Sequence, residues 1–291
     1  MAKRPVQTAA KKGAAQVQDK STAVAKARST SVATMNDDIF ANDAGMGMES
    51  VTTRDLIIPR IGILQKLSPE LDRSHAKFIK GAKEGDFCNI GMNEIIPSPM
   101  LFVPCYFKKQ WLEWAPRKSG EGLKGIHDND HIMAKTKQDN DGKWVLPNKN
   151  YVVETSQLYV DIINEDGTEQ MLAFIPFVST QHKKVRQLLT DSKRIQLKRP
   201  DGSKYDAPLY YRYWKAETIP EDNNEGNWMG WKLSPVGKLN DLDNALEVYD
   251  VSKQFSRQVH EGVAKAEHGD GSDAPSGGYG RGSNADDDSE M

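Results

Sequence analysis

The stretch YVVETSQLYVDIINEDGTEQMLAFIPF, residues 151–177, decides the fold class. Its two ends, residues 151–163 and 171–177, are rich in β-branched and aromatic residues, which favour strands. Between them lies Asn164-Glu165-Asp166-Gly167, and an Asp-Gly pair readily supplies the positive φ angles of a tight turn. The stretch therefore predicts a β-hairpin, and with it a β-rich domain.

Similar stretches surround this hairpin, each bounded by Gly, Pro, Asn or Asp, and we expect strands there too. They are residues 56–64, 85–90, 100–107, 209–216 and 227–233. Pro59, Pro104 and Pro176 fall inside predicted strands. Because proline cannot donate a ladder hydrogen bond, these positions indicate edge strands or bulges.

Two amphipathic helices complete the predicted elements. One opens after Ser179 and runs through HKKVRQLLTDSKRI, with Val185, Leu188 and Leu189 on one side and basic residues opposite. The other starts near Asn240 or Asp241 and places apolar residues at helical spacing as far as residue 263. Residues 115–150 are polar and poorly periodic, so we expect a long loop. The pattern predicts a mainly β fold with one or two helices, an OB-like partly open barrel with long loops and disordered termini.

Composition divides the chain into three regions. Residues 1–50 are predicted to be a disordered basic arm, residues 51–265 the OB-like domain, and residues 266–291 a disordered Gly/Ser-rich acidic tail. The formal net charge of −2 conceals this asymmetry, since residues 1–30 hold seven Lys/Arg and one Asp, whereas residues 261–291 hold eight acids and two bases. The net charge therefore does not exclude a polyanionic partner.

Several classes of protein are disfavoured by what the sequence lacks. No apolar run approaches the ~20 residues that cross a bilayer, and the N-terminus has no secretory h-region, so we expect a cytoplasmic protein. Cys88 and Cys105 are isolated and predicted to be reduced and buried. No phosphate loop, GxSxG elbow or HExxH motif is present, which indicates a protein that is not an enzyme and needs no cofactor. His127-Asp128-Asn129-Asp130-His131 is predicted to be a polar loop; metal binding by His127 and His131 is the alternative.

The positive signal is the interleaving of basic and aromatic residues. Proteins that bind single strands combine cations that track phosphates with aromatic rings that stack on bases. The predicted contacts are Lys108, Lys109, Trp111, Trp114, Arg117, Lys118, Lys183, Lys184, Arg186, Lys193, Arg194, Lys198, Arg199, Tyr211, Arg212, Tyr213, Trp214 and Lys215. The alternative is that the aromatics belong to the core and the cations to an ordinary solvated helix face.

A basic and aromatic domain, a Gly/Ser-rich spacer and an acidic tip (Asp286, Asp287, Asp288 and Glu290) together resemble the single-stranded DNA-binding proteins of phage and bacterial replication. Residues 58–65, 68–70 and 81–87 are also similar to segments of phage-encoded proteins of this kind. The resemblance implies sequence-independent binding of single-stranded DNA in replication, recombination and repair, in the host cytoplasm. It also implies a tail that recruits replication or recombination proteins or regulates the binding.

This chain departs from the bacterial pattern at its tip. The bacterial tails end in an aromatic residue after the acids, whereas this chain ends in Met291 and its nearest tail aromatic is Tyr279. Two other functions fit the same composition. A recombination mediator or strand-annealing protein would use a similar surface and would be a homo-oligomer. A non-enzymatic phage structural or assembly protein would bind protein surfaces instead.

Overall fold

The computed structural model describes residues 43, 46–51, 58–165, 167–168, 170–223, 226–264 and 266, without the side chain of Arg117. The chain divides into two compact units, residues 1–50 and 51–291, and the sheets and helices lie in the second. The predicted tail beyond residue 266 and most of the predicted basic arm lie outside the described residues.

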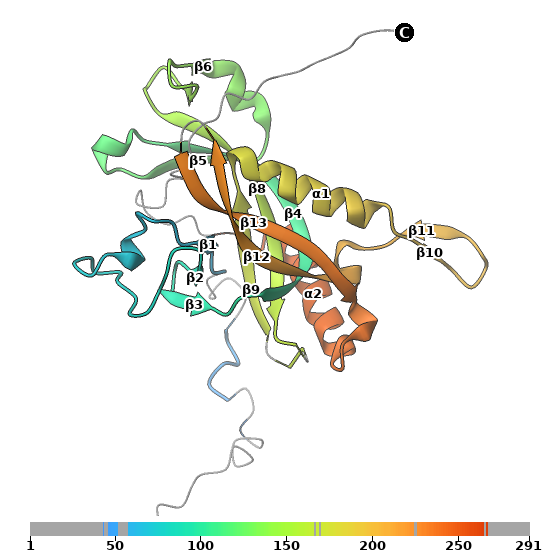
Figure 1. Cartoon of the computed structure of the whole chain (residues 1–291). Helices are drawn as coiled ribbons and strands as arrows, with labels where there is room; N and C mark the ends of the chain where they lie inside the picture. The colour runs from blue at the N-terminus through green and yellow to red at the C-terminus, as the bar shows by residue number, and fades with distance from the viewer. Residues whose placement is uncertain are drawn as a thin grey trace, which may run out of the picture. The chain divides into compact units, whose positions relative to one another are not determined.

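The centre of the fold is an antiparallel pair of long strands, β4 (Met100–Trp114) and β8 (Tyr151–Ile163). At one end, β12 (Arg212–Asn223) pairs with β4 and carries β13 (Gly226–Lys238), while β9 (Gln170–Phe177) pairs with β8. The sheet curls into a half-barrel, which confirms the mainly β, OB-like partly open barrel (Figure 1).

Turn and bulge chemistry explain two features of this sheet. The N–H of Gly167 donates to the carbonyl of Asn164 at 3.2 Å, and Gly167 has φ +76°, so the predicted hairpin between β8 and β9 is confirmed. Pro104 lies in the central strand β4, where the register with β8 shifts between Pro104 and Tyr106. A bulge there accommodates the missing N–H, as the sequence predicted.

A small sheet lies across the opening between β9 and β13. It consists of β1 (Ile61–Ile63), β2 (Phe87–Asn89) and β3 (Glu94–Ile96), all antiparallel. On one side, the N–H of Phe174 in β9 donates to the carbonyl of Pro59 at 2.9 Å. On the other, the amide of Gln65 donates to the carbonyl of Met229 in β13 and accepts from its N–H, both at 2.9 Å. The small sheet thus links the two outer strands of the half-barrel.

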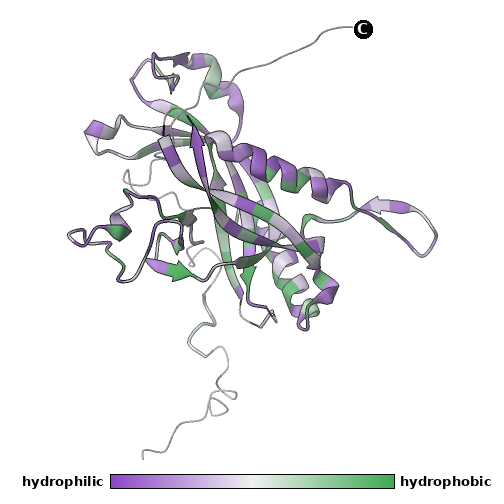
Figure 2. Cartoon of the chain, in the orientation of Figure 1, coloured by the Kyte–Doolittle hydropathy of each residue, from purple (hydrophilic) through white to green (hydrophobic). Residues whose placement is uncertain are grey.

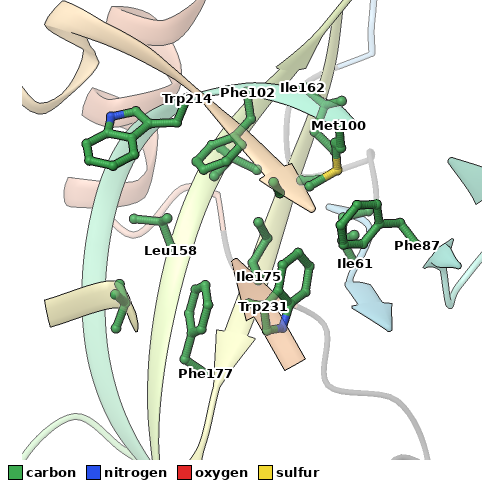
Figure 3. Packing of buried hydrophobic residues seen from close by; sticks show 14 of the residues in the cluster. Ile61, Phe87, Met100, Phe102, Leu158, Ile162, Ile175, Phe177, Trp214 and Trp231 are labelled. Carbon is green, nitrogen blue, oxygen red and sulfur yellow. The ribbon is translucent and has the colours of Figure 1, made fainter. Parts of the chain in front are cut away.

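The main core lies on the face of the sheet that α1 (His182–Lys193) covers. Figure 3 shows side chains from β4, β8, β9, β12 and β13 meeting there. Val185 and Leu188 of α1 are buried in the same cluster, while hydrophilic residues line much of the helix (Figure 2). The amphipathic helix predicted after Ser179 is therefore confirmed.

The opposite face of the sheet is covered by α2 (Ala245–His260). Phe255 and Val259 pack near Cys105, and Val248 packs in a second cluster with Val103. The helix begins later than predicted, because Leu239–Asp241 forms a separate 3₁₀ turn and Leu242 is extended. Within the described residues, no helix is long and apolar enough to cross a membrane.

Both cysteines are free and buried, as predicted. Burial raises the pKa of the Cys88 thiol to about 12 and also raises that of Cys105, which keeps both thiols protonated and unreactive.

The long loop predicted for residues 115–150 is wrong. This segment holds β5 (Leu123–His127), β6 (Lys137–Gln138), β7 (Trp144–Val145) and the 3₁₀ helices Arg117–Ser119 and Asp130–Lys135. β5 pairs with the far end of β4, whereas β7 pairs with the start of β8 and carries β6. These strands are short and largely solvent-facing, so they lack the apolar runs on which strand prediction depends.

Candidate nucleic-acid interface

Two of the predicted stacking residues lie in the core. Trp114 is 2% exposed beside Leu112 and Tyr151, and Trp214 is 1% exposed in the main core. Tyr211 and Tyr213 are half-buried, and Tyr213 packs against the cluster around Val103. Neither tryptophan presents a ring on which a base could stack, so the stacking role predicted for them does not fit their positions.

Trp111 lies differently, because it is half-buried on β4 between two polar cross-strand neighbours. Its partner on β8 is Glu154 and its partner on β5 is His127. Cross-strand partners point to the same face of a sheet, as do residues two apart along one strand. Lys109 and Glu113 therefore share the face of Trp111, and this face continues from the main core beyond Phe107.

A second tryptophan reaches this face from β7. Trp144 is 43% exposed and pairs with Val152, which in turn pairs with Glu113. Trp111 and Trp144 thus lie on the same face, separated by two strand spacings and by two residues along the strands, or about 12 Å. We call this surface the tryptophan face and define it by Lys109, Trp111, Glu113, His127, Trp144 and Glu154. Trp144 was missed in the sequence because it falls in the supposed loop, although Gly142-Lys143-Trp144-Val145 has the composition of a strand after a turn.

Glu113 ties the strands of the tryptophan face together. One oxygen accepts from Asn150 at 2.5 Å and from Asn148 at 3.3 Å, and the other lies 3.2 Å from Nε2 of His127. Burial alone would raise the pKa of Glu113, but these hydrogen bonds outweigh it and the pKa is lowered. An ionised Glu113 therefore connects β4 and β5 to the segment that joins β7 with β8, and so holds β7 and Trp144 in place.

The N-terminal end of α1 adjoins the tryptophan face. Nδ1 of His182 lies 3.0 Å from Oγ of Ser156, and Ser156 pairs with Lys109 on that face. Burial lowers the pKa of His182, so the ring is neutral at neutral pH. The next turns of the helix expose Lys183 and Arg186. Cations of α1 thus begin where the tryptophan face ends.

Many of the predicted cations carry an acidic partner. The pairs are Lys108 with Asp128 (2.9 Å), Lys109 with Glu154 (2.9 Å), Lys184 with Glu221 (2.7 Å), Arg194 with Asp191 (3.8 Å), Lys215 with Glu217 (3.5 Å) and Lys193 with Asp206. Two of these lysines are less accessible from the tryptophan face than Lys109 is. Lys108 points to the opposite face of the sheet, and Lys184 is largely buried. Exposed pairs contribute little stability, so a phosphate can replace the acid at low cost.

The remaining predicted cations have no acidic partner in the described part of the chain. Lys183, Arg186 and Lys198 are exposed along α1 and the segment after it, Lys118 is exposed after β4, and Arg212 is half-buried at the start of β12. The guanidinium of Arg199 lies 4.8 Å from the ring centre of Tyr205. The side chain of Arg117, and all four acids of the tail tip (Asp286, Asp287, Asp288 and Glu290), lie outside the described residues.

After α1 the chain forms a hairpin of β10 (Gln196–Lys198) and β11 (Lys204–Asp206). The N–H of Gly202 donates to the carbonyl of Arg199 at 2.9 Å, and Gly202 has φ +84°. Pro200-Asp201-Gly202 could have predicted this turn. Residues 182–206 contain eight Lys/Arg and three Asp. We call their exposed cations the basic ridge, comprising Lys183, Arg186, Lys193, Arg194, Lys198, Arg199 and Lys204.

The histidines of the His127–His131 motif are separated by the local structure. His127 ends β5 and contacts Glu113, whereas the backbone N–H of His131 donates to Asn129 at the start of a 3₁₀ helix. Among the described residues, no group of three or more His, Cys, Asp or Glu side chains is arranged to hold a metal ion.

Comparison with known proteins gives one finding about the family. No curated protein and no solved structure matches the chain. The model of the Pam3 phage gp34-like protein family matches residues 20–265, which include the sheets, both helices, the tryptophan face and the basic ridge. Because this match covers most of the 291 residues, the chain belongs to the Pam3 phage gp34-like protein family.

Proposed function

We propose that this member of a phage protein family binds single-stranded DNA without sequence preference and without a catalytic step. The observation that carries the proposal is the placement of Trp111 and the exposed Trp144 on one face of the half-barrel, beside the cationic side of α1. Aromatic rings bind every base through its π-face, and cations bind the phosphates between them, so the two together suit a strand of any sequence.

The spacing of the two rings favours an unstacked strand. Bases in a duplex stack about 3.4 Å apart along a strand, whereas the two tryptophans are about 12 Å apart. A strand crossing the tryptophan face would place bases of nearby nucleotides on separate rings. Stacking on each ring contributes about 1–3 kcal/mol.

Phosphates of the same strand would meet Lys109, Lys183 and Arg186. Lys109 is paired only with the partly exposed Glu154, and the other two have no acidic partner among the described residues. Neutralising phosphates releases the counterions condensed on the nucleic acid, so binding should weaken steeply with salt.

Titration of the protein with poly(dT), followed by intrinsic tryptophan fluorescence, tests the proposal. We expect quenching that saturates at low salt, and an affinity whose logarithm falls linearly with the logarithm of salt concentration. Matched poly(rU) titrations compare RNA with DNA. If poly(dT) causes no quenching and no anisotropy change at low salt, the proposal is wrong.

A further inference from the structure

We infer that the β10–β11 hairpin is a second nucleic-acid element that contacts duplex, so that the protein binds junctions between single and double strands. Only the single-stranded half of this inference rests on the proposed function. The duplex half rests on the hairpin itself.

The hairpin is a short two-stranded ribbon with most of its surface in solvent. All three residues of β11 are exposed, and in β10 only Leu197 is half-buried. It extends beyond the C-terminal end of α1, away from the half-barrel (Figure 1). Lys193 of α1 pairs with Asp206 at the base of the hairpin, and the N–H of Ala207 donates to the carbonyl of Ile195 at 2.9 Å. These contacts hold the ribbon at the end of the helix.

Two lysines oppose each other on this ribbon. Lys198 and Lys204 are direct cross-strand partners, and neither makes an ion pair with any residue that the structure describes. Like charges placed directly opposite destabilise a pair of strands. An anion bound between or beside the two ammonium groups would relieve that repulsion, which makes the pair a suitable phosphate contact.

The arginine beside this pair is held in a defined position. Arg199 lies over the ring of Tyr205 at 4.8 Å, and its Nη1 donates to Oγ of Ser203 at 3.3 Å. A stacked guanidinium keeps its other N–H groups available for phosphate or a base edge. The same contact covers one face of Tyr205, the only aromatic residue in the hairpin. Tyr205 is 36% exposed and keeps at most one face for stacking, so the hairpin offers fewer stacking surfaces than the tryptophan face.

The shape of the hairpin also favours duplex over single-stranded DNA. The major groove of B-DNA is about 12 Å wide and admits a two-stranded β-ribbon. The twelve residues of α1 span about 18 Å, so the tryptophan face and the hairpin are separated by at least that distance along the basic ridge. A single strand on the tryptophan face and a duplex at the hairpin would thus be contacted by one molecule without competing for the same residues.

The test compares three labelled probes by anisotropy: poly(dT), a blunt duplex, and the same duplex carrying a poly(dT) overhang. We expect the full-length protein to bind the overhang probe at least about tenfold more tightly than either simple probe. Replacing the three exposed cations of the hairpin (Lys198→Ser, Arg199→Ser and Lys204→Ser) should remove this advantage and most duplex binding. It should also reduce the slope of log affinity against log salt by roughly 3 for the overhang probe.

The matched control removes three exposed lysines elsewhere, by Lys66→Ser, Lys80→Ser and Lys83→Ser, and should leave the tenfold preference intact. Equal loss in both triple variants, or an unchanged preference in the hairpin variant, would overturn the inference. The two proposals fail separately. Duplex binding that depends on the hairpin, without any poly(dT) binding, would contradict the proposed function and the single-stranded half of this inference but not the role of the hairpin. Poly(dT) binding without duplex binding would contradict only the role of the hairpin.

Discussion

Oδ2 of Asp161 accepts a hydrogen bond from Oγ of Ser252 at 3.2 Å, which joins the central strand β8 to α2 through a fully buried carboxyl. Among the residues that the structure describes, the other oxygen, Oδ1, has no hydrogen-bond partner, and the thiol of Cys105 lies close by. Burial raises the pKa of Asp161 to about 7, against a smaller opposing effect of the Ser252 hydrogen bond. A carboxyl that keeps its proton up to about pH 7 in the folded state makes stability depend on pH.

Between about pH 4 and pH 7, the folded protein retains a proton on Asp161 that the unfolded chain has lost. We therefore expect the free energy of unfolding to fall as pH rises through this window, by up to about 1.4 kcal/mol per unit. Asp161→Asn should remove that dependence and stabilise the protein at pH 8. Urea unfolding at pH 5, 7 and 8 measures it, with the exposed Asp250→Asn as control. An Asp161→Asn variant with unchanged pH dependence would contradict the assignment.

Glu113 should affect poly(dT) binding, because its hydrogen bonds position β7 and Trp144. Glu113→Ala removes the acceptor for Asn148, Asn150 and His127, so we expect faster amide hydrogen exchange in residues 144–150 and weaker poly(dT) binding. Glu113→Gln keeps one acceptor oxygen and should retain part of the protection. Glu121→Ala, an exposed change in the turn between β4 and β5, is the control. Unaltered exchange in Glu113→Ala would show that Trp144 is positioned by other contacts.

Gln65 should stabilise the link between the small sheet and β13. Gln65→Ala leaves both the N–H and the carbonyl of Met229 without the side-chain partner they have now. Unsatisfied half-buried groups cost about 1–3 kcal/mol, so the free energy of unfolding should fall by that amount. Chemical denaturation measures it against Gln187→Ala on the exposed side of α1. A loss no larger than that of the control would mean that water replaces the side chain fully.

The elements that the sequence predicts well are those whose local and global signals agree. The hairpin of β8 and β9 combines apolar strands with an Asp-Gly turn, and α1 combines helical spacing with a buried stripe at Val185 and Leu188. β5, β6 and β7 are stabilised mainly by pairing with β4 and β8, so their own sequences lack a clear strand pattern. Short strands that pair at the edge of a sheet are therefore the elements that cannot be predicted from their own residues.

The proposed binding residues also divide into those that can be predicted from the sequence and those that depend on tertiary packing. The sequence predicts the cations of α1 and two of the three in the hairpin, Lys198 and Arg199, because charge is visible in the sequence; Lys204 is not among the predicted contacts. Exposure is not visible there: Trp111 and Trp114 lie three residues apart and so point to opposite faces, but only tertiary packing decides that Trp114 is the buried one. Trp214 is buried for the same reason, beneath neighbours from distant strands.

The central claim is that Trp111 and Trp144 bind unpaired bases, and the most direct test is the poly(dT) affinity of the Trp111→Ala/Trp144→Ala double variant. At fixed low salt, loss of both rings should weaken binding by about 2–6 kcal/mol, or at least thirtyfold. The matched control is Trp228→Ala. Trp228 is half-buried on β13 and its Nε1 donates to Glu221, and this variant should bind poly(dT) nearly as tightly as the unmodified protein does. A double variant that binds poly(dT) as tightly as the Trp228→Ala control would contradict the account.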